Sequence, residues 1–179
     1  MMRFLSKMSG GAARPPGVGL SEIVLSWMGA FLGVSAVALV FYGFFRDANM
    51  VMMIGSFGAS AVLVFGGIRS PLAQPRNLVG GHVLSAVVGV AAFHLLPGQV
   101  WLAAPLGVAT AIGVMQATKT LHPPGGATAL IAVVGGSQIH DLGYSYAIAP
   151  VGLGAIIMLA VALVVNNIPH NRKYPEFWY

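Results

Sequence analysis

Long apolar stretches separated by short polar connections make up most of the chain after its first twenty residues. A helix needs about 20 apolar residues to cross the hydrocarbon core of a bilayer. Six stretches are candidates for membrane helices: Ile23–Phe45, Met50–Ile68, Leu78–Leu96, Val100–Thr118, Gly125–Gly136 and Ala147–Asn166. The pattern therefore predicts an all-α membrane protein with about six transmembrane segments.

The fifth stretch is shorter than the others. A dozen residues form a helix of about 18 Å, which does not cross a bilayer. It follows the sequence Leu121-His-Pro-Pro-Gly-Gly126, in which helix formation is interrupted. We therefore expect a half-helix here. The preceding segment, Thr118–His122, would be extended over about 16 Å and would carry the chain from the membrane surface towards the midplane.

Composition supports a membrane protein and excludes several other classes. Hydrophobic residues make up 57% of the chain and charged residues 7%, whereas soluble domains are about 25% charged. The net charge of +5 does not indicate nucleic-acid binding, because the basic residues lie singly between apolar stretches. The absence of cysteine excludes disulfides and thiolate chemistry.

The distribution of basic residues predicts the orientation. If the chain crosses six times from a cytoplasmic N-terminus, Arg46 lies outside and eight basic residues lie inside: Arg3, Lys7, Arg14, Arg69, Arg76, Lys119, Arg172 and Lys173. This bias fits the positive-inside rule better than a fifth segment that dips in and returns. We expect a cytoplasmic segment 1–21, one transmembrane domain 22–168 and a cytoplasmic tail 169–179, in a bacterial inner membrane.

Two halves of the chain are similar to each other. Gly58–Leu63 (GASAVL) matches Gly126–Ile131 (GATALI), and weaker similarities flank both words. The sequence thus predicts two three-helix repeats, about 23–96 and 100–166. A unit with three crossings changes orientation when it is repeated, so the halves would be inverted. Inverted repeats with broken helices that meet near the midplane are typical of transporters.

The segment around His122 is the strongest candidate for chemistry. Proline at position 123 restricts His122 to extended geometry, and Pro124 suits a first helical turn. The start of a helix presents unpaired N–H donors and a partial positive charge, and it can bind anions. Such a site avoids the cost of a buried charged side chain.

The first repeat supplies a matching segment, Ile54–Ser60. We expect both helix starts to face one small cavity near mid-membrane, with Phe57 as a gate and Lys119 at the cytoplasmic entrance for anions. The predicted binding residues are Ser56, Phe57, Gly58, Ala59, Ser60, His122, Pro123, Pro124, Gly125, Gly126, Ala127 and Thr128.

Structural roles remain open for many of these residues. Glycines such as Gly58, Gly80 and Gly81 commonly serve close helix packing, and hydroxyls commonly bond to their own helix. His82 and His94 lie twelve positions apart on one predicted helix, which is too far for a shared metal ion, so each is interpreted as a polar contact. No metal-ligand spacing, nucleophile elbow or dinucleotide motif appears, so we expect neither an enzyme nor a cofactor.

Three long blocks and the C-terminus resemble the HPP family of integral membrane proteins, which is named for a histidine-diproline motif. The blocks are GSFGASAVLVFG, SPLAQPRNLVGGH and HPPGGATALIAVVGG, and the ending is RKYPEFWY. Chloroplast and cyanobacterial members of the family are linked to nitrite transport. The resemblance therefore implies transport of nitrite or a similar small monovalent anion, although four or five spans are usually described for the family.

Two alternatives to a carrier stay open. They are an anion channel that uses the same site, and a membrane sensor or scaffold that transports nothing. The chain is small for a transporter and has small-residue helix faces, such as Gly29/Gly33. We therefore expect a homo-oligomer, most simply a homodimer, in the lipid bilayer.

Overall fold

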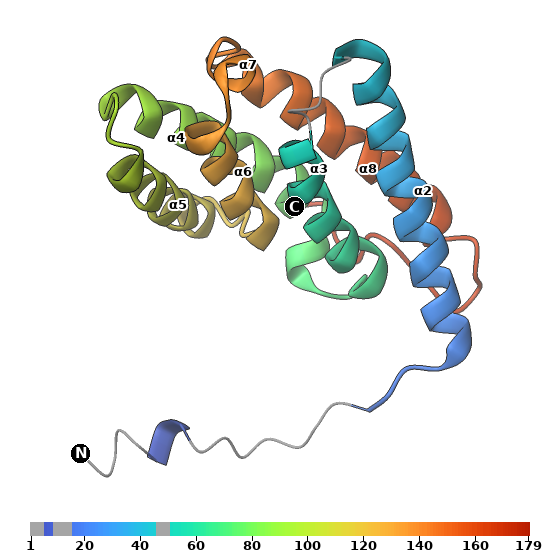
Figure 1. Cartoon of the computed structure of the whole chain (residues 1–179). Coiled ribbons are helices and arrows are strands. Elements are labelled where there is room, and N and C mark those ends of the chain that lie inside the picture. The colour runs from blue at the N-terminus through green and yellow to red at the C-terminus, as the bar shows by residue number, and fades with distance from the viewer. Residues whose placement is uncertain (1–5, 9–15, 46–50) are drawn as a thin grey trace.

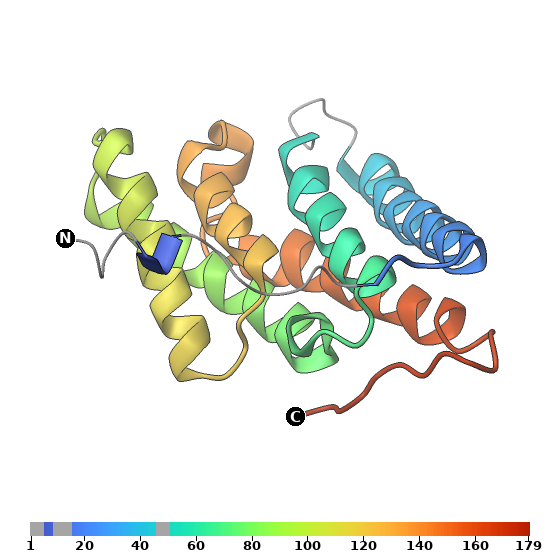
Figure 2. The same cartoon turned by 90° about the horizontal axis from the view of Figure 1, so that it is seen from below.

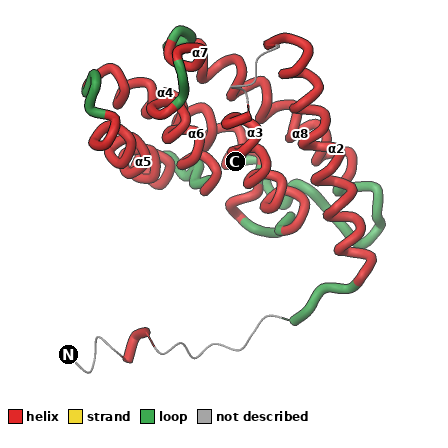
Figure 3. Tube along the Cα trace, viewed as in Figure 1, coloured by secondary structure: helices red, strands yellow, loops and turns green. Residues whose placement is uncertain are grey.

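The computed structural model describes residues 6–8, 16–45 and 51–179, and in these ranges every regular element is a helix (Figure 3). The basic residues Arg3, Arg14 and Arg46 lie outside the described ranges. The α-helices are α2 (Leu20–Phe45), α3 (Val51–Ala61), α4 (Gly81–Leu95), α5 (Val100–Ala117), α6 (Pro123–Val134), α7 (Ser137–His140) and α8 (Leu153–Val165). Short 3₁₀ or π segments are η1 (Ser6–Met8), η3 (Val62–Gly66), η4 (Pro71–Ala73), η5 (Arg76–Gly80) and η6 (Ala147–Gly152).

Four helices in the described part of the chain are long and apolar enough to cross a membrane: Leu20–Gly43, Arg76–Leu95, Val100–Ala117 and Ala147–Val165. The prediction of an all-α membrane protein is therefore confirmed. The fifth predicted stretch is short, as expected. The second predicted stretch corresponds to α3 and η3, and its helical structure ends at Gly66, two residues before the predicted end, after a π-helical segment.

The helices form two layers. Viewed from below, α5, α6, α3 and α2 follow one another from left to right, and α4 and α8 cross behind them (Figure 2). The outer helices of this row, α2 and α5, are the long helices that open the two predicted repeats. The two short helices, α3 and α6, lie side by side between them (Figure 1). This order brings both short helices to the centre of the molecule.

Two apolar clusters stabilise the layers. One joins α2, α3 and α8 through Phe41, Phe57 and Met158, with Phe65 from η3. The other joins α4, α6 and η6 around Ala86, Ile131 and Tyr146. The candidate site lies at the boundary of these clusters, because Phe57 of the first cluster contacts His82 on α4.

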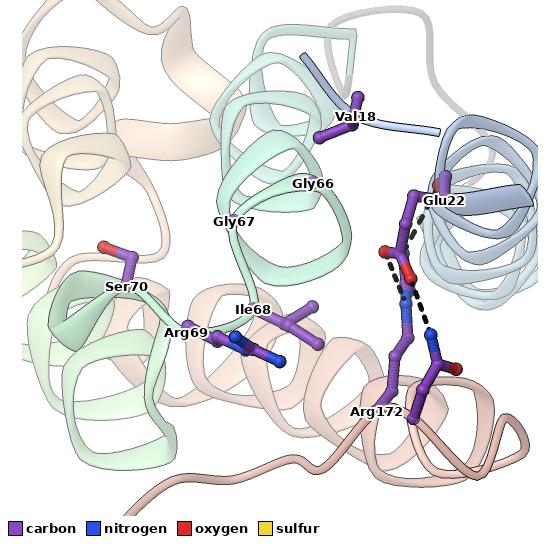
Figure 4. Close-up of a pocket in the computed structure, with 9 residues that line it drawn as sticks. Val18, Glu22, Gly66, Gly67, Ile68, Arg69, Ser70 and Arg172 are labelled. Atoms are coloured by element: carbon purple, nitrogen blue, oxygen red, sulfur yellow. Dashed lines mark hydrogen bonds and ion pairs between the residues drawn. The ribbon is translucent and has the colours of Figure 1, made fainter. Parts of the chain in front are cut away.

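The C-terminal tail is attached to the same end of the molecule as residues 66–76. Arg172 forms an ion pair of 2.6 Å with Glu22 at the start of α2 (Figure 4). The Tyr174 hydroxyl donates to the Ala73 carbonyl at 2.7 Å. Burial raises the pKa of Tyr174, so this hydroxyl stays protonated and remains a donor at neutral pH.

Candidate functional site

Proline chemistry shapes the start of α6. His122 precedes the helix with φ −137° and ψ 103°, which confirms the predicted extended geometry before Pro123. The first two helical residues are prolines and carry no N–H, and the Gly125 N–H donates to the His122 carbonyl at 2.8 Å. Polar side chains, rather than backbone N–H groups, are therefore the prominent hydrogen-bonding groups at this helix start.

Residues of η5 and α4 hold the segment before α6 in place. The Arg76 guanidinium donates to the Thr118 carbonyl at 2.6 Å, and the Asn77 amide donates to the Leu121 carbonyl at 2.9 Å. Gly81 permits this approach, because a Cβ there would lie 2.6 Å from the His122 Cβ. The backbone beside His122 is thus fixed by partners about forty residues earlier in the chain.

Four buried polar side chains meet where α3, α4 and α6 pack together. Ser60 Oγ lies 2.7 Å from His82 Nε2 and 2.9 Å from His122 Nε2. The other nitrogen of His82, Nδ1, lies 2.7 Å from Thr128 Oγ1, and His122 Nδ1 lies 2.8 Å from the Leu72 carbonyl oxygen. All four side chains have essentially no exposed surface. We call Ser60, His82, His122 and Thr128 the histidine–hydroxyl cluster.

The Leu72 carbonyl determines the direction of these hydrogen bonds when both rings are neutral. A carbonyl only accepts, so His122 Nδ1 carries the hydrogen and His122 Nε2 accepts from the Ser60 hydroxyl. With its one hydrogen committed to His122, Ser60 accepts from His82 Nε2. His82 Nδ1 then accepts from the Thr128 hydroxyl. In this arrangement every nitrogen of both rings has a partner of the right kind.

The structure places the predicted binding residues at different depths. Ser56, Phe57, Ser60, His122, Pro124, Gly125 and Thr128 are buried; Gly58, Gly126 and Ala127 are partly exposed; and Ala59, Pro123 and Lys119 are exposed. Ser60, His122 and Thr128 belong to the histidine–hydroxyl cluster. Helix α3 begins at Val51, several residues before Ser56. Ser56 and Ser60 therefore lie inside a helix rather than at the helix start that the sequence suggested.

Phe57 packs in the core beside the cluster. Its ring centre is 4.9 Å from that of His82 and 6.2 Å from that of Phe41. Gly154 lies so close to Phe57 that a Cβ there would be 2.4 Å from the ring. In this conformation Phe57 forms one apolar wall of the cluster.

His82 is the functional candidate that sequence reasoning does not identify. The sequence indicates a polar contact, and His82 makes one, but its partners are the two hydroxyls and the histidine ring of the predicted site. The available signal is its position: a histidine after Gly80 and Gly81, in an apolar segment with no acidic residue. An ionisable side chain inside a membrane segment is by default a functional candidate.

The glycines divide into two groups. The packing interpretation is confirmed for Gly80 and Gly81, which lie against Thr120. Gly29 and Gly33 pack against the Phe65 ring of the same chain and are therefore not available as the face between chains that the sequence suggested. At Gly58 an added Cβ would meet no atom of another element within 4 Å, so the packing interpretation fails there. Its face of α3 is open among the described residues.

A polar concavity of about 430 Å³ lies at the end of the molecule where the tail meets α2 (Figure 4). Its lining includes Arg69, Glu22 and Arg172. Arg172 is engaged by Glu22, Ser26 and Asn166, which indicates a role in attaching the tail. No group of three potential metal-ligating side chains occurs within the described ranges.

Within the described residues, helices of membrane-spanning length surround a central cluster of buried polar side chains, which is the arrangement of an integral membrane protein. The family model described as "HPP, transmembrane region" matches residues 15–175. The chain therefore belongs to the HPP family of membrane proteins.

Two relatives in Dictyostelium discoideum are named only as transmembrane proteins. One is 44% identical over 181 residues, covering 99% of this chain and 58% of the relative. The other is 48% identical over 169 residues, covering 93% of this chain and 59% of the relative. The chain thus spans less than two thirds of the length of these relatives. No solved structure matches it.

Proposed function

We propose that this protein transports nitrite or a similar small monovalent anion across a membrane. The observation that carries the proposal is the histidine–hydroxyl cluster, which lies between the two short helices and α4. Buried polar and ionisable groups inside a membrane protein are costly and mark substrate pathways. HPP family membership, together with the family's link to nitrite, supports the choice of substrate.

The cluster suits a small anion by the kind of donors it offers. Hydroxyls and neutral imidazoles donate hydrogen bonds without a fixed charge, and conduction requires binding weak enough for release. Thr128 lies in the second turn of α6, close to the positive end of that helix. The proposed donors are the side chains of Ser60, His82, His122 and Thr128, in place of the backbone N–H groups expected from the sequence. To bind the anion they would exchange a hydrogen bond within the cluster for one to the anion, assisted by the helix dipole.

The transport fold that we propose consists of two inverted three-helix repeats. The arrangement of the row supports this, since α2 and α3 in one half correspond in order to α5 and α6 in the other (Figure 2). Each half also ends in a helix that opens with a π-helical segment, η5 before α4 and η6 before α8. Contacts of η5 with α8 and of η6 with α4 are reciprocal, as a twofold axis requires.

In a six-crossing topology, the connection 66–76, the segment Thr118–His122 and the C-terminal tail all lie on one side of the membrane. The connection contacts both of the other parts of the chain. The Thr118–His122 segment contacts η5 through Arg76 and Asn77, and the tail contacts η4 through Tyr174. At the other end, the His140 ring stacks on Phe93 with centres 3.8 Å apart. These contacts support a six-crossing topology, because they place the Thr118–His122 segment at one end of the molecule and His140 at the other.

The topology can be tested by introducing single cysteines, because the chain has none. We expect Lys119→Cys and Lys173→Cys to react with an impermeant thiol reagent from the cytoplasmic side. Gln99→Cys and Ser145→Cys should react from the opposite side. Labelling of all four positions from one side would overturn the six-crossing topology and the inverted repeat.

Transport can be tested by nitrite flux into proteoliposomes, corrected for the flux into protein-free vesicles. We expect saturable flux. Ser60→Ala should reduce this flux at least about tenfold, because His82 and His122 then lose the hydroxyl that joins them. His140→Gln is a matched control on a histidine outside the cluster. No flux above protein-free vesicles, with folded wild-type protein, would refute the proposal; a non-saturating flux would favour a channel.

We also propose a homo-oligomer, because the open face of α3 carries the small residues Gly55, Gly58 and Ala59, and small residues allow close packing between membrane helices. Native mass spectrometry in mild detergent should detect a dimer or a higher oligomer. Detection of monomer alone would contradict this.

A further inference from the structure

Each hydroxyl of the histidine–hydroxyl cluster has a second acceptor within reach. Ser60 Oγ lies 3.2 Å from the Ser56 carbonyl oxygen, and Thr128 Oγ1 lies 3.4 Å from the Pro124 carbonyl oxygen. Both acceptors belong to the preceding turn of the hydroxyl's own helix. Each hydroxyl can therefore donate either to a histidine ring or to its own backbone.

These second acceptors allow the cluster to hold one more proton without losing a hydrogen bond to either ring. If His122 gains a proton at Nε2, that nitrogen becomes a donor to Ser60 Oγ, and the Ser60 hydroxyl turns to Ser56. If His82 instead gains a proton at Nδ1, it donates to Thr128 Oγ1, and the Thr128 hydroxyl turns to Pro124. Buried polar groups are expected to be paired, and here both protonation states meet that condition.

The added charge has no carboxylate partner among the described residues. Ser60 and Phe57 on α3, Thr128 on α6 and the Leu72 carbonyl contact the two rings, which also contact each other with centres 5.0 Å apart. Tyr146 approaches the cluster through the Thr128 carbonyl, at 3.2 Å.

The acidic side chains of the described residues lie elsewhere. Glu22 pairs with Arg172, and Asp141 and Glu176 are exposed. A single positive charge in an apolar interior is strongly unfavourable unless an opposite charge accompanies it. A monovalent anion that enters the cluster would be that opposite charge, and its own burial would be favoured in turn by the proton.

We propose that His82, Ser60 and His122 form a proton-binding site, and that a proton and the transported anion occupy the cluster together and cross as an electroneutral pair. This inference rests on the proposed transport function and deepens it. It limits the substrates to small monovalent anions that accept hydrogen bonds, and it makes the pH difference across the membrane, rather than the electrical potential, the driving force.

Proton uptake on anion binding is the direct test. Sodium nitrite is added to purified protein in weakly buffered detergent solution containing a pH indicator, with His82→Gln and the control His140→Gln alongside. We expect wild type and His140→Gln to take up about one proton per nitrite bound, and His82→Gln to take up much less. By linkage, the apparent affinity for nitrite should tighten up to about tenfold for each unit by which pH is lowered. Nitrite binding without proton uptake by wild type would overturn the proposal.

The transport test separates this inference from the function on which it rests. Wild-type proteoliposomes are given either a pH gradient or a potassium diffusion potential set with valinomycin, again with protein-free vesicles as the baseline for nitrous acid leakage. We expect the pH gradient to drive nitrite accumulation and the potential to leave the rate unchanged. Flux driven by potential alone would overturn the electroneutral pair but keep anion transport. Absence of protein-dependent flux would overturn both.

A variant of Ser60 that keeps the hydroxyl separates loss of the hydrogen bonds from loss of the fold. Ser60→Thr keeps the bridge, whereas Ser60→Ala removes it. We expect Ser60→Thr to keep the pH dependence of nitrite binding. Loss of that dependence in both variants, with both folded, would contradict the role of the hydroxyl.

Discussion

His122 and Leu72, fifty positions apart in the sequence, are joined by a hydrogen bond of 2.8 Å from the ring Nδ1 to the backbone carbonyl. A carbonyl cannot donate, so this one contact fixes the hydrogen on Nδ1 and leaves Nε2 of the neutral ring to accept from Ser60. The order of donors in the whole cluster follows from it, because each group has a single hydrogen to offer.

The two histidines should therefore be opposite tautomers at neutral pH. We expect His122 to carry its hydrogen on Nδ1 and His82 on Nε2. Solid-state NMR of ¹⁵N-histidine-labelled protein in bilayers would distinguish them, and His82→Gln and His122→Gln would assign the signals. Two rings with the same tautomer would show that the hydrogen bonds of the cluster do not run in this direction.

Ser60 should contribute to stability as well as to the site. In Ser60→Ala the hydroxyl is removed, and the buried His82 Nε2–H and His122 Nε2 lose their hydrogen-bond partner. An unsatisfied buried group costs about 1–3 kcal/mol, so we expect a clearly lower Tm in detergent. The exposed Ser145→Ala should unfold at the wild-type temperature. Equal Tm values for the two variants would mean that Ser60 has no structural part in the cluster.

Two glycines should respond differently to alanine. At Gly81 the added Cβ would meet the His122 Cβ at 2.6 Å and the Thr120 carbonyl oxygen at 2.8 Å, whereas at Gly58 nothing lies within 4 Å. Overpacking costs about 1–3 kcal/mol, and replacing a helical glycine in open space is favourable by about 0.5–1 kcal/mol. Thermal unfolding should therefore show Gly81→Ala below and Gly58→Ala at or above wild type. The reverse order would contradict the packing of η5 and α4 against the His122 segment.

The two residues of the ion pair at the tail should contribute unequally to stability. The Arg172 side chain is 3% exposed and the Glu22 side chain 34%, and Arg172 also bonds to Asn166 and Ser26. Glu22→Gln leaves a guanidinium that keeps these partners, but Arg172→Gln removes all of its hydrogen bonds. We expect Arg172→Gln to lower Tm more than Glu22→Gln and to expose the tail to protease. Similar losses in both variants would imply that the charge pair alone holds the tail.

Lys119 is exposed in the turn just after α5, so its charge can act on ions outside the protein. We expect Lys119→Gln to slow nitrite flux at low ionic strength and to have less effect at high salt, because salt screens exposed charges within about 10 Å at 0.1 M. Flux assays at two salt concentrations would measure this, with Lys173→Gln as a comparison. An equal loss at both concentrations would exclude steering by the charge.

The sequence by itself determined the elements of this protein. Apolar stretches of sufficient length predicted the long helices, since backbone groups in lipid must be paired within the segment. The length of the fifth stretch predicted a short helix, which is observed as Pro123–Val134. Pro123 determined the extended geometry of His122, because the clash between a proline ring and the preceding residue is purely local.

Only the tertiary structure decided what these elements place together. Ser60 lies 22 positions before His82 and 62 before His122, and no local preference relates such distant residues. The tight approach of α4 at Gly81 and Gly125 brings His82 into the predicted site. Apolar periodicity reports that a helix is buried but not which neighbour it faces, because the choice depends on the fit of two surfaces, and that fit is formed only when the whole chain packs.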